Sequence, residues 1–192
     1  MKNVMLGAFL LLLLSCGAEP NNELEQKTVE NPIETVPADY NPEAKLGELN
    51  ITLRDQGTPV ANYVHAVRTG NLIFLAGKGP KQANGENIIG KLGEDLGVEE
   101  GYKAAQEVAI NQLSVLKSEL GNLNKVKRVV KVKGMVNAIP DFKEHSKVVN
   151  GYSDLMVAVF GDAGKHARAA VGMGSLPGNM AVEVEMIVEV YE

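Results

Sequence analysis

The chain has 192 residues, a formal net charge of −5 at pH 7 and a single cysteine, and 5% of its residues are aromatic. This length suffices for one domain with its own core but not for two. The chain has no basic run and few aromatic residues, so its composition argues against nucleic-acid binding, which needs cations for phosphates and rings for bases. A lone cysteine also excludes a disulfide within the chain and a cysteine-based metal site.

The N-terminus has the pattern of a secretory signal. Lys2 precedes an uncharged apolar stretch at residues 4–14, which is shorter than the roughly 20 residues that a membrane-spanning helix needs. The sequence LLSCG at 13–17 resembles the lipobox of bacterial lipoproteins. We therefore expect removal of residues 1–15 and lipid on Cys16, which would hold the protein at a membrane of the cell envelope, facing the periplasm or the exterior. The alternatives are an uncleaved anchor and a buried free thiol.

Residues 16–45 lack the apolar periodicity of a helix or a strand. They contain scattered acids and four prolines, Pro20, Pro32, Pro37 and Pro42. Such a segment buries too little apolar surface to offset its conformational entropy. We predict a flexible tether at 16–45 and an ordered domain at 46–192.

The first half of this domain has the signals of a hairpin followed by a helix. Two short runs rich in β-forming residues, 63–68 and 72–76, are separated by a Thr-Gly-Asn turn. Apolar positions then recur at spacings of three and four after Gly97, which predicts a helix that ends at Gly121.

The second half continues with a strand, a helix and two further strands. Residues 125–137 are β-branched and partly alternating, which predicts a strand. A helix is expected to begin at Asp141, which has a glutamate three residues on as in a capping box, and to end at Gly161. Strands are expected at 167–173 and 181–191, joined as a hairpin. The whole order predicts an α+β sandwich in which two helices cover one face of a mixed sheet.

Five residues are candidates for chemistry on residue type alone. The three histidines, His65, His145 and His166, have no metal-like spacing, so we expect surface or hydrogen-bonded histidines and no metal site. Arg168 stands among small residues in the first C-terminal strand, where a guanidinium can hold a carboxylate through two parallel hydrogen bonds. Glu183 is expected opposite it on the partner strand, and a cross-strand ion pair on a solvated face is the alternative interpretation.

Longer stretches of sequence follow one another in a recognisable order from Tyr63 to Val190. They are Asn62–Val64, Arg68–Phe74, Ala76–Gly77, Ala167–Val171, Leu176–Pro177 and Val182–Glu185. In these stretches the chain resembles the Rid/YjgF family of reactive-intermediate deaminases. The resemblance implies a chorismate-mutase-like two-layer sandwich and a homotrimer with a small cleft between neighbouring subunits. We therefore expect a protein that acts without a metal or an organic cofactor.

The resemblance also implies roles for individual residues. In deaminating members an arginine holds the carboxylate of a 2-imino acid, and water hydrolyses the C=N bond to give a 2-oxo acid and ammonia; the matching residue is Arg168. The family's water-positioning acid falls on Glu183, its cleft tyrosine on Tyr63 and its helix asparagine on Asn150. Its Ser-Gly-Gln turn falls on Ala76, Gly77 and Lys78, so that the serine and the glutamine are absent here.

These matches give a first hypothesis of function. We expect an envelope-anchored deaminase of imine or enamine forms of small 2-amino-acid-derived carboxylates, with Arg168, Glu183 and Tyr63 in catalysis. Gly77, Lys78 and Asn150 join Arg168 in holding the substrate. The alternative is a noncatalytic trimeric module that binds a small carboxylate metabolite or a protein partner through the same arginine. The ribonuclease activity attached to some family members is disfavoured by the acidic balance.

Overall fold

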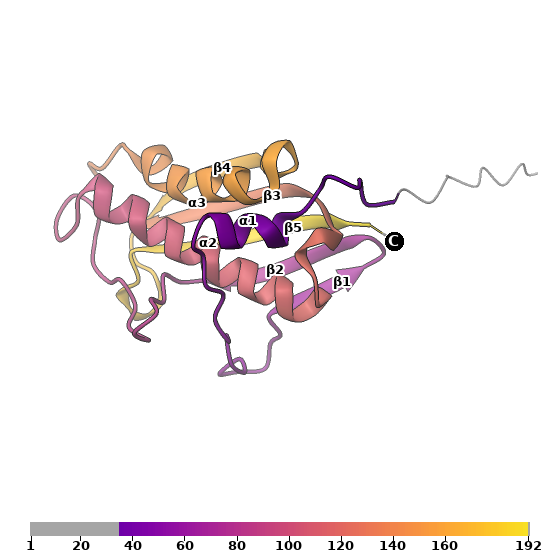
Figure 1. Cartoon of the computed structure of the whole chain (residues 1–192). Helices are drawn as coiled ribbons and strands as arrows, with labels where there is room; N and C mark the ends of the chain where they lie inside the picture. The colour runs from indigo at the N-terminus through magenta and orange to yellow at the C-terminus, as the bar shows by residue number, and fades with distance from the viewer. Residues whose placement is uncertain (1–34, 192) are drawn as a thin grey trace, which may run out of the picture. The chain divides into compact units, whose positions relative to one another are not determined.

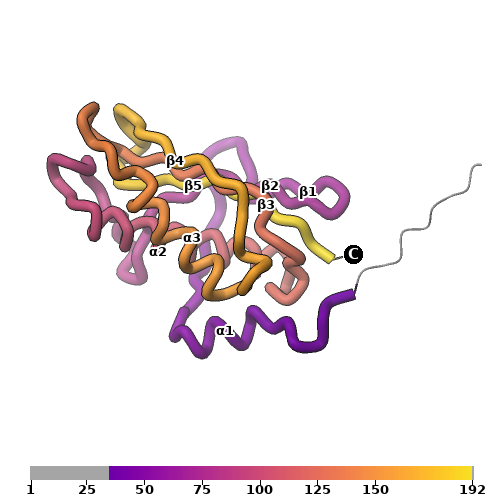
Figure 2. The backbone as a smooth tube through the Cα atoms, turned by 90° about the horizontal axis from the view of Figure 1, so that it is seen from above, coloured from indigo at the N-terminus to yellow at the C-terminus, as the bar shows by residue number. Residues whose placement is uncertain are grey.

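The computed structural model describes residues 35–191, so the expected signal peptide, Cys16 and most of the predicted tether lie outside the described residues. A five-stranded sheet forms one layer, and two long helices, α2 (Val98–Leu120) and α3 (His145–Phe160), cover one of its faces (Figure 1). A short helix, α1 (Pro42–Glu48), contacts α3 and lies on the side of the helices away from the sheet (Figure 2). The predicted α+β sandwich is confirmed.

The sheet has the strand order β1-β2-β5-β3-β4 and is mixed. Its strands are β1 (Ala66–Thr69), β2 (Leu72–Lys78), β3 (Val126–Asn137), β4 (Ala167–Met173) and β5 (Val182–Val190). The β3–β4 pair is parallel and the other three pairs are antiparallel. The predicted C-terminal hairpin is therefore wrong. The chain returns from α3 as the edge strand β4 beside β3, and the link that follows carries β5 past β3 to the centre of the sheet.

The central position of β5 agrees with its sequence pattern. Its five alternate residues from Val182 to Val190 are at most 1% exposed and face the helices. Glu183, Glu185, Ile187 and Glu189 lie on the opposite face, which we call the outer face of the sheet. Burial of one full row of apolar side chains on each central strand is what holds the helices to the sheet.

Helix α2 forms as predicted. The carboxylate of Glu100 accepts the N–H of Gly97 at 3.1 Å, and Gly121 ends the helix in the left-handed conformation, with φ of 72°. Helix α3 begins at His145 instead of Asp141. After Pro140 the chain closes a turn in which the Phe142 N–H donates to the Ile139 carbonyl, and this turn takes the place of the expected cap.

The ordered part of the chain begins earlier than predicted. Asn41 caps α1 by accepting the Ala44 N–H at 3.1 Å, and proline at the first helical position favours the helix. Tyr40 donates its hydroxyl to the Val126 carbonyl at 2.6 Å, and Glu43 pairs with Lys117 at 2.8 Å. The boundary between tether and domain at residue 46 is therefore wrong, since these contacts hold residues 40–45 against the domain.

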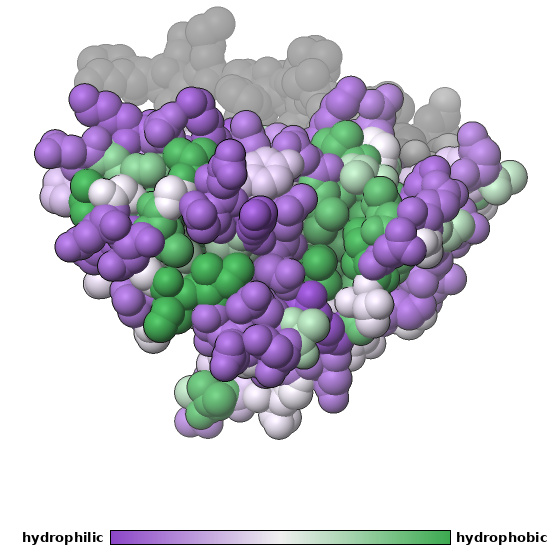
Figure 3. Space-filling model, turned by 60° about the vertical axis from the view of Figure 1, so that its left-hand side comes forward, coloured by the Kyte–Doolittle hydropathy of each residue, from purple (hydrophilic) through white to green (hydrophobic). Residues whose placement is uncertain are grey.

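The surface at the loop end of the molecule carries apolar side chains in patches divided by polar ones (Figure 3). None of the helices within residues 35–191 has the length and apolar character needed to cross a lipid bilayer.

Candidate functional site

Arg168 lies on the edge strand β4 and points to the helix side of the sheet. It is in register with Val132 of β3, and Val132 with Met186 of β5, and both of these are buried under the helices. Arg168 Nη1 donates to Asn150 Oδ1 at 2.8 Å and to Ser153 Oγ at 3.0 Å. Residues 150 and 153 are one helical turn apart, so α3 presents both acceptors to β4. The structure thus brings together Arg168 and Asn150, two of the residues expected to bind substrate.

The partners of Arg168 are electrically neutral. Both hydrogen bonds use Nη1, and within residues 35–191 the Nε and Nη2 groups have no hydrogen-bond partner. A guanidinium has five N–H donors, and the Nε–Nη2 edge can hold both oxygens of a carboxylate. His166 Nε2 lies 3.0 Å from Ser153 Oγ, and we call Arg168, Asn150, Ser153 and His166 the arginine half-site. It retains a positive charge and an unused pair of donors.

Glu183 lies on the outer face of β5, next to Gly77 of β2. A Cβ atom built on Gly77 would overlap Glu183 Oε1 and lie 3.0 Å from Cδ. Glycine at position 77 therefore leaves the room in which the carboxylate of Glu183 lies. Burial raises the pKa of Glu183, the charge of Glu185 raises it further, and Lys133 opposes both. Glu183 and Gly77 form a second cluster, the glutamate half-site.

The approach of Gly77 to Glu183 depends on a β-bulge. The register of β2 against β5 shifts between Leu75 and Lys78. Gln112, fully buried on α2, donates from Nε2 to the carbonyls of Ala76 (3.1 Å) and Val184 (2.8 Å), one on each strand. Gln112 was not among the site residues expected from the sequence. A large polar residue within the apolar stripe of α2 was the sequence feature that could have indicated it.

Arg168 and Glu183 do not meet within one chain. Strand β3 lies between β4 and β5, and Glu183 is in register with Met135 on the outer face, whereas Arg168 is in register with Val132 on the helix face. The cross-strand ion pair considered from the sequence is therefore wrong. The two half-sites occupy opposite faces of the sheet.

Tyr63 and Lys78 gather around His65 instead. Lys78 Nζ lies 2.8 Å from His65 Nδ1, and the ring of Tyr63 meets the imidazole edge-on at 6.5 Å between centroids. Burial lowers the pKa of Lys78, and the charge of Lys81 lowers it further. Lys78 is in register with Val184 on the helix face, so its ammonium group and the Glu183 carboxylate are on opposite sides of the sheet.

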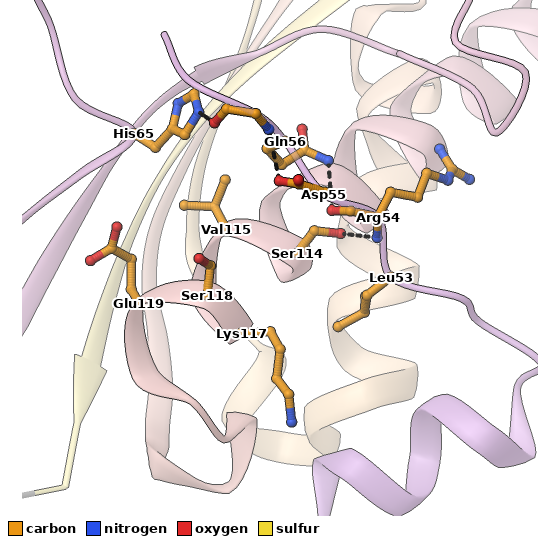
Figure 4. Close-up of a pocket in the computed structure, with 11 residues that line it drawn as sticks. Leu53, Arg54, Asp55, Gln56, His65, Ser114, Val115, Lys117, Ser118 and Glu119 are labelled. Carbon is orange, nitrogen blue, oxygen red and sulfur yellow. Dashed lines mark hydrogen bonds between the residues drawn. The ribbon is translucent and has the colours of Figure 1, made fainter.

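His65 borders a cavity of about 310 Å³ between α2 and the segment 53–57 (Figure 4). Its Nε2 lies 3.0 Å from the Gly57 carbonyl, and Ser114 Oγ accepts the Arg54 N–H at 3.0 Å. The side chains of Arg54 and Lys117 point away from one another, and their charges pair with Glu107 and Glu43. Both of these cations are therefore paired, unlike the guanidinium of the arginine half-site. No group of three potential metal ligands occurs within the described part of the chain.

Comparison with known proteins adds relatives of similar length. Protein TCP17 of Trypanosoma cruzi is 44% identical over 147 residues, which are 76% of this chain and 92% of the relative. The RutC family protein PYRAB12510 of Pyrococcus abyssi is 30% identical over 130 residues, which are 67% of this chain and 87% of the relative.

Two solved structures share the fold. The protein Atu1372 of Agrobacterium tumefaciens, described as having unknown function, is 40% identical with a TM-score of 0.72, covering 79% of this chain and 92% of that one. A "putative endoribonuclease" of Shewanella oneidensis is 29% identical with a TM-score of 0.75, covering 78% and 99%. Those crystallised chains consist almost entirely of the matched part, so residues 35–192 of this chain contain a fold that forms on its own in these relatives.

A family model agrees with these matches. The model, described as "YjgF/chorismate mutase-like, putative endoribonuclease", matches residues 43–190, which include both half-sites and all five strands. The chain belongs to the YjgF/RutC family.

Proposed function

We propose that this protein is a deaminase of the cell envelope, anchored through lipid on Cys16. It hydrolyses imine or enamine forms of small 2-amino-acid-derived carboxylates to 2-oxo acids and ammonia, with no metal and no organic cofactor. The observation that carries the proposal is the state of Arg168. Its guanidinium is partly buried, neutral acceptors fix one nitrogen, and its Nε–Nη2 edge has no partner among the described residues.

The reaction needs few groups beyond an arginine that binds the substrate carboxylate. An imine carbon is already electrophilic, so binding the carboxylate and directing one water molecule at the C=N bond supply most of what catalysis requires. Glu183 is suited to take a proton from that water, because its raised pKa lies closer to neutral pH than that of an exposed glutamate. Arg168 binds the substrate in this scheme and Glu183 activates the water.

The two half-sites must come from different copies of the chain, because they lie on opposite faces of the sheet. The outer face offers a surface for this association. Val67 of β1, Phe74 of β2 and Val171 of β4 are 56%, 42% and 36% exposed there, and Phe74 is in register with both Val67 and Ile187. Large apolar side chains exposed on one sheet face are typical of a subunit interface. We infer a homotrimer whose clefts combine the arginine half-site of one copy with the glutamate half-site of the next.

A noncatalytic carboxylate-binding module is the second candidate, and the turn at 76–78 favours it. Ala76 has no hydroxyl, and the ammonium group of Lys78 is engaged with His65. The turn therefore supplies glycine and backbone groups, but no polar side chain, to the glutamate half-site. Such a module keeps the carboxylate clamp and lacks part of the polar lining that a reaction would use.

One experiment separates these candidates. An amino-acid oxidase generates imines in place, and ammonia release is compared among residues 35–192, Arg168→Ala, Arg168→Lys and Arg68→Ala. Arg68 is the matched control, because it is an exposed strand arginine whose Nε donates to the Gly70 carbonyl. We expect faster release with the unmutated domain and with Arg68→Ala, and release at the buffer rate with Arg168→Ala. Lysine keeps the positive charge but cannot donate two parallel hydrogen bonds to a carboxylate, so the rate of ammonia release with Arg168→Lys should be intermediate.

The outcomes point in different directions. Release at the buffer rate with every imine contradicts the deaminase, and calorimetric binding of a 2-oxo acid would then support the module. Full activity in Arg168→Ala would show that the arginine half-site is not the clamp. RNA cleavage, assayed in parallel because relatives are named endoribonucleases, is expected to be absent.

A further inference from the structure

We propose that Ser153 and His166 are positioning residues that fix the Arg168 guanidinium through Nη1, so that its Nε–Nη2 edge faces the substrate carboxylate. The inference rests on the proposed function and extends it to two residues that were not expected from the sequence to have a role in substrate binding or catalysis. Neither residue needs to touch the substrate.

The side chains of His166, Ser153 and Arg168 form one series of hydrogen bonds that starts at the backbone carbonyl of Gly164. His166 Nδ1 lies 2.6 Å from the carbonyl of Gly164, His166 Nε2 lies 3.0 Å from Ser153 Oγ, and Ser153 Oγ accepts from Arg168 Nη1 at 3.0 Å. Gly164 ends a 3-10 helix, Gly161–Gly164, and His166 lies between this helix and β4; Ser153 belongs to α3 and Arg168 to β4. This series of hydrogen bonds therefore connects the edge strand β4 to helix α3, which covers it.

The direction of each hydrogen bond follows from the carbonyl at one end. A carbonyl oxygen only accepts, so Nδ1 of His166 carries the ring proton and Nε2 of the neutral ring accepts. The single hydroxyl proton of Ser153 is then given to His166, and the lone pairs of Oγ face Arg168. Without the imidazole, the hydroxyl could rotate its proton toward the guanidinium and repel it. His166 thus keeps Ser153 in the acceptor state that Arg168 needs.

The charge state of His166 supports this arrangement. Burial lowers its pKa and the charge of Arg168 lowers it further, against the opposing effect of the Gly164 carbonyl, so the neutral ring is favoured at neutral pH. Asn150, Ser153 and neutral His166 therefore orient the guanidinium without neutralising its charge. An acidic residue in place of any of these three would form an internal ion pair and compete with the substrate carboxylate.

The backbone at Gly164 is also fixed. A Cβ atom there would lie 2.6 Å from the carbonyl carbon of Met156 and 2.8 Å from Cα of Val157. This close approach places the Gly164 carbonyl against α3, so the acceptor for His166 has a defined position. The series of hydrogen bonds therefore begins at Gly164, whose backbone is packed against α3, and ends at Arg168.

The test measures binding of 2-oxobutanoate by calorimetry and the kinetics of ammonia release on residues 35–192. We expect Ser153→Ala and His166→Phe each to raise Kd and KM about tenfold, with kcat changed less than twofold, since each loses the orientation of one charged hydrogen-bonding group. Ser153→Thr, which keeps a hydroxyl, should bind within about twofold of the unmutated domain. Ser153→Asp should not bind. Ser118→Ala, an exposed serine of α2, is the matched control and should change nothing.

Two results would overturn the inference. In the first, Ser153→Ala binds as tightly as the unmutated domain although Arg168→Ala does not bind; the proposed function then survives and the positioning role fails. In the second, Ser153→Thr binds as weakly as Ser153→Ala, which would assign the loss to a packing change at position 153. If Arg168→Ala itself binds normally, the clamp of the proposed function fails first, and this result is distinct from the other two.

Discussion

Gly151 of α3 lies where α3 packs on α2, and alanine there should destabilise the domain. A Cβ atom at 151 would overlap the carbonyl oxygen of Tyr102 and lie 2.9 Å from its carbonyl carbon. These are backbone atoms of α2, so no side-chain rotation can relieve the contact and the helices must separate. Overpacking typically costs about 1–3 kcal/mol, and a backbone contact places this case near 3. The better helix propensity of alanine offsets about 1 kcal/mol, which leaves a net loss of about 2 kcal/mol.

Gly47 of α1 provides the matched control, because it is also a helical glycine but a Cβ atom added to it would meet no atom within 4 Å. Gly47→Ala should therefore stabilise the domain by about 0.5–1 kcal/mol through propensity alone. Urea denaturation of both variants measures the difference, about 3 kcal/mol, and with a slope of roughly 2 kcal/mol/M the midpoint of Gly151→Ala should fall by about 1 M. Equal midpoints for the two variants would refute the close approach of α2 and α3. Since Asn150 and Ser153 flank Gly151, Gly151→Ala should also weaken carboxylate binding.

Three further predictions concern single polar groups. Because the pKa of Glu183 is raised, its ionisation costs stability as pH rises above 4.5. Compared with the unmutated domain, Glu183→Gln should therefore have a higher Tm at pH 7 and the same Tm at pH 4, and it should lose turnover. A lower Tm than the unmutated domain at pH 7 would contradict this. The pKa of His166 is lowered, so the domain should lose stability as pH falls below 6.5, and His166→Gln should flatten that part of the urea-midpoint profile. Tyr40→Phe leaves the Val126 carbonyl without its 2.6 Å partner and should cost about 1 kcal/mol in urea denaturation, whereas no loss would mean that water replaces the hydroxyl.

Sequence patterns predicted those elements whose signals are local. Helix α2 has an apolar stripe between Gly97 and Gly121, and β5 alternates strictly enough to identify its buried face. The start of α3 was missed because a turn after Pro140 competes with the cap at Asp141. Strand order was missed for a different reason. The link at 174–181 is equally consistent with a hairpin and with a crossing over β3, and the choice depends on where the parallel strand β4 pairs.

A family resemblance supplied most of the residues proposed for the site but not their arrangement. Arg168 and Asn150 were both expected at the cleft from a family resemblance, but their hydrogen bond was not, since no spacing rule relates a mid-helix asparagine to that strand. Ser153 was not expected at the site, and His166 was expected only as a surface or hydrogen-bonded histidine. Their bond joins a helix to the end of a loop, and a lone histidine gives no sign of its partner. Lys78 was misplaced because the β-bulge turns its side chain toward His65.

The separation of Arg168 from Glu183 prevents their charges from pairing within one chain. If β4 and β5 were neighbours, the two charges would form a cross-strand ion pair, in which each would satisfy the other and neither would be available to a ligand. With β3 between them the strands are about 10 Å apart, and the two side chains lie on opposite faces. Arg168 then stays charged among neutral acceptors, and Glu183 keeps a raised pKa beside Glu185. A cleft that uses both groups needs two copies of the chain, so a variant that blocks association through the outer face should lose turnover while its isolated arginine half-site still binds a carboxylate weakly.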